Sequence, residues 1–230
     1  MSASAIRLME ILGLGPVVPV LTIEDAAEAL PLAAALHAGG LRVIEVTLRS
    51  AAALPALEQI ARRHSDLVVG AGTVRRPEDF RAARDAGAQF AVSPGFTPEL
   101  HAAAAAAALP WLPGVATPSE VLLAQAVGHD LLKFFPADIG GGPAALRAFA
   151  TVFPDVAFCP TGGITAATAS ALALASATAS VKASRSSLAR SFRSKRMPPS
   201  PVAPEPTAIS STSPTRSVMS TRTSMVLRAT

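Results

Sequence analysis

The sequence predicts an α/β fold, and within that class a (β/α)8 TIM barrel, on two observations. Short apolar runs alternate with Ala-rich helical segments from residue 16 to about residue 164. Alternation of this kind indicates parallel strands joined by crossover helices. Seven such units, with room for an eighth, favour a closed barrel over an open sheet.

The strands are expected at the apolar runs. In chain order these are PVVPV (16–20), LRVIEV (41–46), LVVGA (67–71), QFAVS (89–93), WLPGV (111–115), LLKFF (131–135) and VAFCP (156–160). An open doubly wound sheet remains the alternative. It is less favoured because no glycine-rich dinucleotide fingerprint follows the first run.

The helices are expected between these runs, as in residues 24–40 and 77–89. Proline near a predicted start costs little, because the first N–H groups of a helix have no partner within it. Glycine is common just past a helix C-terminus. The prolines concerned are Pro77, Pro98 and Pro118, and the glycines are Gly39, Gly40, Gly87 and Gly128.

Composition limits the class of protein. Half of the 230 residues are hydrophobic, enough to bury a core, and no uninterrupted apolar run approaches the ~20 residues of a membrane span. The N-terminus lacks a clear signal-peptide layout. Cys159 is the single cysteine, which excludes an internal disulfide and a cysteine-based metal cluster. We therefore expect a cytoplasmic protein without a membrane partner.

The charge is divided unevenly along the chain. Residues 1–170 carry 11 Lys and Arg against 15 Asp and Glu, whereas residues 171–230 carry 9 basic residues and one acid, Glu205. No glycine follows Gly163, and residues 176–230 are rich in Ser, Thr, Pro and Arg. Such a composition does not bury enough surface to offset chain entropy.

The predicted organisation is therefore a barrel core over 1–170, an altered eighth unit over 171–184 and a disordered basic tail over 185–230. A nucleic-acid or membrane-surface arm is one interpretation of the tail. Unselected sequence is the other, and we favour it because no aromatic interleaving or repeated basic motif supports an arm. No nucleic-acid partner is therefore expected.

Lys133 is the only lysine among the first 170 residues, which hold ten arginines, and it lies inside the apolar run LLKFFP. Burial disfavours the charged ammonium form, and a neutral amine can form a Schiff base with a carbonyl. The alternative is a lysine whose amine reaches water from the end of a strand. The absence of other lysines in the core favours function.

Glu45 lies inside a β-branched strand, where a carboxylate is costly unless it is paired. Strand alternation places Val43, Glu45, Thr47 and Arg49 on one face. Glu45 is thus a candidate general acid/base, or else the partner of Arg49 in an internal ion pair. Arg49 suits a substrate carboxylate, and a solvated strand-end arginine is the alternative.

Three turns after strands carry weaker signals. Thr73 follows Gly70-Ala71-Gly72, where small residues let a ligand approach the backbone, although GAGT also makes an ordinary turn. Ser93-Pro94-Gly95 repeats this layout. Thr161-Gly162-Gly163 lies where barrels often bind phosphate. The four histidines fall in helices or turns, so neither a metal site nor a cofactor is predicted.

Taken together, these motifs resemble the aldolases of 2-keto-3-deoxy-6-phosphogluconate (KDPG), which also act on 4-hydroxy-2-oxoglutarate (KHG). The matching stretches span nearly all of residues 15–165. They are GPVVPV (15–20), the AGG-R-IEVTLR block (38–49), VGAGTV (69–74), GAQFAVSPG (87–95), the LPGV-TPSE region (112–120), KFFPA (133–137) and FCPTGGI (158–164).

The resemblance implies a homotrimeric (β/α)8 barrel and a class I aldolase that needs no metal. It assigns the Schiff-base lysine to Lys133 and the proton-transferring glutamate to Glu45. The substrate, a 2-keto-4-hydroxy acid, and its product pyruvate would contact the remaining candidates. These are Arg49, Thr73, Pro94, Phe135, Thr161, Gly162 and Gly163.

The chain departs from the family after Gly163. The glycine–serine loop that completes the family's phosphate site is missing, so the eighth strand and the last helix are doubtful. Intact upstream motifs followed by an abrupt change of composition suggest a shifted reading frame. A weakly active or inactive remnant of an aldolase is therefore the alternative to an active enzyme. A related 2-keto-3-deoxy-6-phosphogalactonate aldolase is less favoured.

Overall fold

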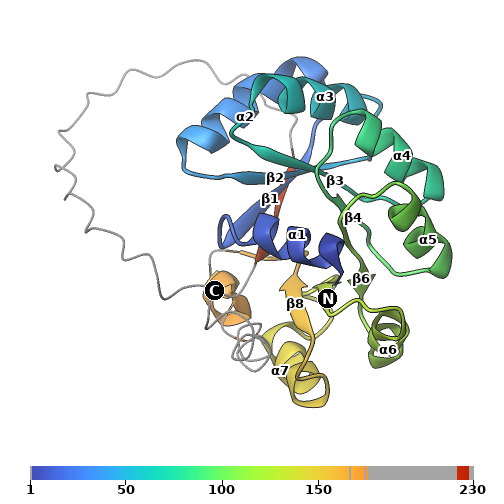
Figure 1. The fold of residues 1–230 in the computed structure, drawn as a ribbon. Helices are drawn as coiled ribbons and strands as arrows, with labels where there is room; N and C mark the ends of the chain where they lie inside the picture. The colour runs from blue at the N-terminus through green and yellow to red at the C-terminus, as the bar shows by residue number, and fades with distance from the viewer. Residues whose placement is uncertain (1, 166, 174, 176–221, 228–230) are drawn as a thin grey trace, which may run out of the picture.

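The computed structural model describes residues 2–165, 167–173, 175 and 222–227 (Figure 1). Seven strand positions run parallel to one another, as the alternation of the sequence predicts. They are β1 (Val17–Thr22), β2 (Val43–Thr47), β3 (Val68–Gly72), β4 (Ala91–Val92), β5 (Trp111–Leu112) with β6 (Gly114–Val115), β7 (Leu131–Phe134) and β8 (Ala157–Pro160).

The strands form two hydrogen-bonded sheets that share one stretch of chain. The first sheet has the order β5-β4-β3-β2-β1-β9 and the second the order β6-β7-β8. They meet at residues 111–115, where Pro113 separates β5 from β6. Pro113 has no N–H to donate to a ladder, but its carbonyl accepts from the Lys133 N–H at 2.8 Å. The two sheets therefore continue into each other.

Helices cover the outer face of the strands, as Figure 1 shows. After the 3-10 turn η1 (Ala26–Glu28) come α2 (Ala29–Ala38), α3 (Ala53–Arg63), α4 (Pro77–Asp85), α5 (Pro98–Ala106), α6 (Pro118–Ala126) and α7 (Gly142–Val152). Residues 167–173 are also helical. Among the described residues, no helix is both long and apolar enough to span a membrane.

The helix boundaries follow the predicted signals. Pro77, Pro98 and Pro118 each lie in the first turn of a helix. Gly87 and Gly128 come just after α4 and α6 with φ of +93° and +88°, a conformation that glycine adopts without strain. Side chains also cap helix starts. Thr97 accepts from Leu100, for example, and the Thr117–Glu120 pair forms a capping box.

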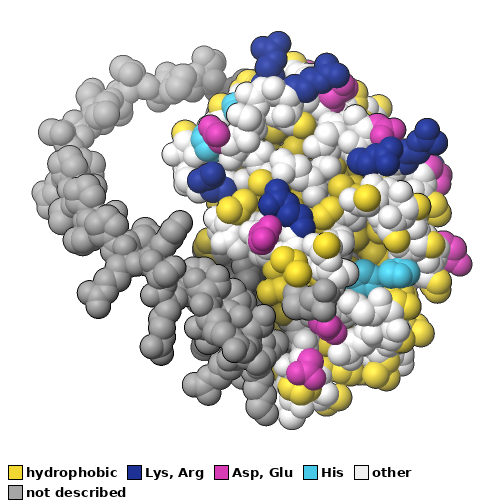
Figure 2. Space-filling model, viewed as in Figure 1, with side chains coloured by type: hydrophobic (Ala, Val, Ile, Leu, Met, Phe, Trp, Pro, Cys, Tyr) yellow, Lys and Arg dark blue, Asp and Glu magenta, His cyan; other side chains and the backbone are white. Residues whose placement is uncertain are grey.

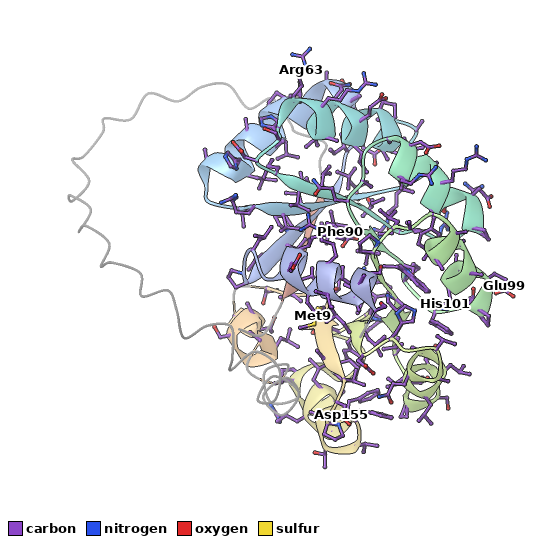
Figure 3. The ribbon with its side chains drawn as sticks, viewed as in Figure 1. Met9, Arg63, Phe90, Glu99, His101 and Asp155 are labelled. Carbon is purple, nitrogen blue, oxygen red and sulfur yellow. The ribbon has the colours of Figure 1, made fainter. Side chains whose placement is uncertain are left out.

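The interior of the strands is packed and is covered at one end by α1 (Ala3–Leu12). Leu8, Ile11 and Leu12 of this helix join the inward-facing strand residues in one buried cluster. Phe90, labelled near the middle of the strands in Figure 3, belongs to the same cluster. Because α1 occupies the N-terminal end of the strands, the opposite end is left for a binding site.

The eighth position of the barrel is taken by a strand that the sequence does not predict. Strand β9 (Arg222–Leu227) pairs antiparallel with β1 along its whole length, from Val17 opposite Leu227 to Thr22 opposite Arg222. It lies beside β8 as well, but among the described residues no ladder joins the two.

Residues 222–227, within the tail that the sequence predicts to be disordered, form strand β9. That expectation rests on side chains that bury little surface, whereas an unpaired strand edge offers backbone N–H and C=O groups to almost any extended segment. The rest of 176–230 lies outside the described residues. The division into 1–170, 171–184 and 185–230 therefore stays a prediction, although Leu172 and Ala175 do pack against the core.

Candidate active site

The predicted alternation along β2 is confirmed and defines the site. Val43 belongs to the interior cluster, while Ile44 and Val46 pack outward against the helices. Glu45 and Thr47 therefore face the barrel interior, each at most 1 % exposed. Thr47 donates to the Leu21 carbonyl at 3.0 Å and its Oγ1 lies 2.9 Å from that of Thr22.

Lys133 meets Glu45 across the interior. Its Nζ lies 3.9 Å from Glu45 Oε1, and the lysine is 5 % exposed. The two residues belong to β7 and β2, which are not neighbours in either sheet. Their approach therefore depends on the curvature of the whole barrel. This geometry excludes the alternative of a lysine that reaches water from the strand end.

The Glu45 carboxyl group has an unusual environment. Burial raises its pKa above the ordinary value, and the positive charges of Lys133 and Arg49 offset part of that rise. Neither carboxylate oxygen accepts a hydrogen bond from the described residues. A buried acid of this kind holds and releases a proton nearer neutral pH than an exposed glutamate does.

Gly72 leaves the space that the Glu45 side chain occupies. A Cβ atom at this position would overlap Oε1 and Cδ of Glu45. The backbone of Gly72 lies opposite Thr47 in the β2–β3 ladder. Gly72 therefore sets how the carboxyl group is held, a role that sequence reasoning missed because only the close approach reveals it.

We expect Gly72→Ala to displace the Glu45 carboxyl group and to lower kcat about tenfold or more, since small misplacements of catalytic groups are costly. Lys133, to which the resemblance assigns the Schiff base, should still react with pyruvate. Gly95→Ala is the matched control, because a Cβ at Gly95 would meet nothing within 4 Å. Equal rates for the two variants would contradict the role of Gly72.

Arg49 pairs with Thr73 at the C-terminal ends of β2 and β3. Arg49 Nε donates to Thr73 Oγ1 at 3.0 Å, and Thr73 has a φ of +58°. No ion pair joins Arg49 to Glu45 among the described residues, so the predicted alternative of an internal pair is wrong. The reason is that Arg49 lies two residues past the end of β2, near the exposed rim, whereas Glu45 lies inside.

The ends of β7 and β8 carry the next group of predicted residues. Lys133 Nζ lies 5.2 Å from the centroid of the Phe135 ring. Thr161 is buried, and its Oγ1 is 3.4 Å from the Cys159 carbonyl. A Cβ at Gly162 would lie 3.2 Å from the Phe135 ring. The Phe135 ring therefore lies close to both Lys133 and Gly162.

Pro94 is held in place by a network that the sequence did not predict. The Ser93 hydroxyl donates to the Gly95 carbonyl at 2.6 Å, and Trp111 Nε1 donates to Ser93 Oγ at 3.0 Å. The absent side chain of Gly114 lets the Pro94 carbonyl approach closely. A buried tryptophan N–H needs an acceptor, which is the one sequence signal that could have indicated Ser93.

The surface pair of His101 and His129 lies outside this site. Figure 2 shows histidine side chains in cyan at the molecular surface, and Figure 3 labels His101 on α5. His101 Nδ1 is 3.0 Å from His129 Nε2, and His129 packs edge-on against Trp111. Burial and the neighbouring His101 lower the pKa of His129 to about 4, although Asp130 opposes the shift.

This pair predicts a loss of stability in mild acid. Because the pKa of His129 is about 4 in the folded chain and 6.5 as the reference value, the unfolded chain binds more protons between these values. The contribution of the uncharged His129 to the free energy of unfolding is therefore complete above pH 6.5, and it is lost as the pH falls towards 4. We expect His129→Asn to reduce the drop in unfolding free energy between pH 7 and 4.5 by about 1–2 kcal/mol. Urea unfolding would measure this, with His64→Asn as the control.

Comparison with known proteins gives a consistent result. The family model "KDPG and KHG aldolase" matches residues 8–191. A 2-dehydro-3-deoxy-phosphogluconate aldolase of Pseudomonas aeruginosa is 50 % identical over 148 residues, which are 64 % of this chain and 67 % of that relative.

Two solved structures are also similar. The KDPG aldolase of Legionella pneumophila with pyruvate captured as a covalent carbinolamine intermediate is 46 % identical, with a TM-score of 0.67 over 68 % of this chain and 76 % of that one. The KDPG aldolase of Zymomonas mobilis with 3-phosphoglycerate is also 46 % identical. Its TM-score is 0.68, over 72 % of this chain and 78 % of that one.

Proposed function

Because the chain belongs to the KDPG and KHG aldolase family, we propose that it is a class I aldolase that cleaves 2-keto-4-hydroxy acids to pyruvate and an aldehyde. KDPG would give glyceraldehyde 3-phosphate, and KHG would give glyoxylate. The observation that carries this proposal is the buried approach of Lys133 Nζ to Glu45 Oε1, at 3.9 Å.

The reaction would begin at Lys133. Its neutral amine attacks the C2 ketone and forms a C–N bond, and the ketone oxygen leaves as water, so that an iminium ion remains. Within the described part of the chain, Glu45 is the acid that forms an ion pair with this nitrogen. With its raised pKa it can take up and return protons during these steps, acting through a water molecule.

Carbon–carbon cleavage would follow from the iminium. Glu45, again through water, removes the proton of the C4 hydroxyl. The C3–C4 bond breaks and its electron pair passes into the iminium, which becomes an enamine while the aldehyde departs. Protonation of C3 and hydrolysis of the regenerated iminium then release pyruvate and restore the Lys133 amine.

The other predicted residues would hold the substrate. Arg49 and Thr73, joined by a 3.0 Å hydrogen bond, lie at the mouth of the barrel, where a guanidinium can bind the pyruvate carboxylate. Pro94 and Phe135 would border the carbon chain. Thr161, Gly162 and Gly163 would face the aldehyde end. The positions of these residues, just after the C-terminal ends of the strands, support the assignments.

Trapping with borohydride tests the function directly. Pyruvate and sodium borohydride should leave a stable mass addition on the peptide that contains Lys133. An adduct on Lys182 or Lys195, the only other lysines, or no adduct at all would contradict the assignment. The same experiment without pyruvate is the control.

An inactive remnant of an aldolase is the second candidate, and one observation favours it. The eighth position holds an antiparallel strand, and no ladder joins it to β8 in the described part of the chain. A cooperative thermal transition together with the pyruvate adduct would support the enzyme. A chain that melts without cooperativity and forms no adduct would support the remnant.

The homotrimer and the cytoplasmic location stay predictions. Leu122 and Leu123 of α6 are each 59 % exposed, which is a surface that a second copy could cover. Light scattering should then give three times the 23.4 kDa of one chain, and Leu122→Lys should lower that mass. A single-chain mass for the unaltered protein would contradict the trimer.

A further inference from the structure

Two histidines from different units of the barrel meet on its outer side. His101 belongs to α5, and His129 lies in the turn between α6 and β7. Figure 3 labels His101 at the outer edge of α5. Both residues are half-buried, so solvent still reaches them. The proposed reaction makes no use of this pair, which leaves it free for a ligand from solution.

The spacing of the two facing nitrogens suits a metal ion. His101 Nδ1 and His129 Nε2 are 3.0 Å apart. Metal–nitrogen bonds of about 2.0–2.1 Å, as in zinc–imidazole sites, would enclose an angle of roughly 90° over this distance. Neighbouring ligands make this angle in square-planar and octahedral sites, whereas a tetrahedral site needs a wider one. The geometry therefore favours Cu²⁺ or Ni²⁺, which imidazole binds well, over Zn²⁺.

The hydrogen bond within the pair does not prevent this binding. One of the two nitrogens donates and the other accepts. An ion would take the place of the shared proton, and the donor ring would carry its proton on its other nitrogen instead. A small turn of each ring then points both lone pairs at the ion. Both rings stay neutral, which is the form of imidazole that binds metals, and no proton is lost from the pair.

The surroundings of the pair also favour a cation. Trp111 and Phe96 pack against the His129 ring, with centroids 5.2 and 6.1 Å away, and so limit its movement. The negative charge of Asp130 acts on His129. Within the described part of the chain, no group of three or more His, Cys, Asp or Glu side chains could hold a metal ion. Water would therefore fill the other coordination positions.

We propose that His101 and His129 form a binding site for one Cu²⁺ or Ni²⁺ ion, held by His101 Nδ1 and His129 Nε2. The site is separate from Lys133 and Glu45. A bound ion would join α5 to the turn before β7. The sequence did not predict this site because its two ligands are 28 residues apart and meet only in the folded chain.

Tryptophan fluorescence tests the proposal. Trp111 is the only tryptophan, and the chain has no tyrosine. Because Trp111 packs against His129, an ion held by the pair should quench its emission. Titration of the untagged full chain with Cu²⁺ or Ni²⁺ at neutral pH should give saturable quenching that EDTA reverses. Mg²⁺ should give none, since it prefers oxygen ligands, and Cu²⁺ should bind more tightly than Ni²⁺.

Variants identify the ligands. We expect His101→Gln to weaken binding about tenfold or more, because even the loss of a group that only orients a ligand costs about 10–100-fold in metal affinity. His64→Gln is the matched control, since it removes a histidine at the end of α3, outside the pair. Equal affinity of His101→Gln and the unaltered protein, or an equal loss in His64→Gln, would overturn the proposal. So would the absence of saturable quenching in the unaltered protein.

Electron paramagnetic resonance keeps the proposal testable if a variant does not fold. Cu²⁺ bound to the unaltered protein should show coupling to two imidazole nitrogens, and a spectrum without this coupling would overturn the site. Melting in EDTA shows whether His101→Gln is folded. In a folded variant the spectrum should show one imidazole nitrogen at most. None of these readouts requires the chain to be an active aldolase.

Discussion

Replacing Lys133 by methionine is expected to abolish both the borohydride-trapped pyruvate adduct and the cleavage of KDPG. Methionine keeps an unbranched apolar side chain but removes the only amine within 4.0 Å of Glu45 in the described residues. Loss of a covalent nucleophile costs catalysis of the order of 10⁴-fold or more. Steady-state assays of pyruvate release, together with mass spectrometry of the trapped protein, measure both effects.

The fold should survive this substitution, which makes the test clean. Removing Lys133 takes one of the two positive charges from Glu45, so the carboxyl group should become protonated more readily. A protonated, uncharged glutamic acid is tolerated in the interior far better than an unpaired carboxylate. A melting temperature close to that of the unaltered protein is the control. Retained cleavage in a folded Lys133→Met variant would refute the Schiff-base assignment.

The sequence could predict Lys133 and Glu45 because two simple rules place them. Alternation along a strand fixes which residues face inward, and parallel connections bring all strand C-termini to one end. Both rules are local in the chain and hold whatever the details of packing. These rules do not give the 3.9 Å between Lys133 Nζ on β7 and Glu45 Oε1 on β2, because that distance depends on how the strands curve around the interior.

Two kinds of feature could not be predicted from the sequence: the close approach of atoms to particular glycines, and the pairing of β9 with the edge of β1. Gly72 and Gly114 matter for the space they leave to Glu45 and Pro94, and a pattern does not say which atoms will fill that space. Strand β9 escaped prediction for a different reason. Its pairing with β1 uses backbone N–H and C=O groups. A segment whose composition forms no core can therefore still pair with a free strand edge.

Glu45→Gln is expected to lower kcat by about 10²–10⁴-fold, the range over which a positioned general acid or base contributes. Glutamine has nearly the same shape as glutamate but does not exchange protons. The Lys133 amine remains in this variant, but formation of the iminium loses the group proposed to transfer its protons. Pyruvate trapping at Lys133 should therefore persist at a reduced rate, which distinguishes loss of proton transfer from loss of the nucleophile.

The pH dependence gives the sharper readout of the same substitution. Burial raises the pKa of Glu45. As the pH falls, Glu45 therefore loses its ionised, proton-accepting form at a higher pH than an exposed glutamate does. The acid limb of kcat should accordingly lie above pH 4.5 and should disappear in Glu45→Gln. Stability should change in the opposite direction: the folded state binds this proton more tightly, so unfolding free energy falls as the pH rises from 4.5 through the raised pKa. An unchanged acid limb in Glu45→Gln would assign the proton transfer to another group.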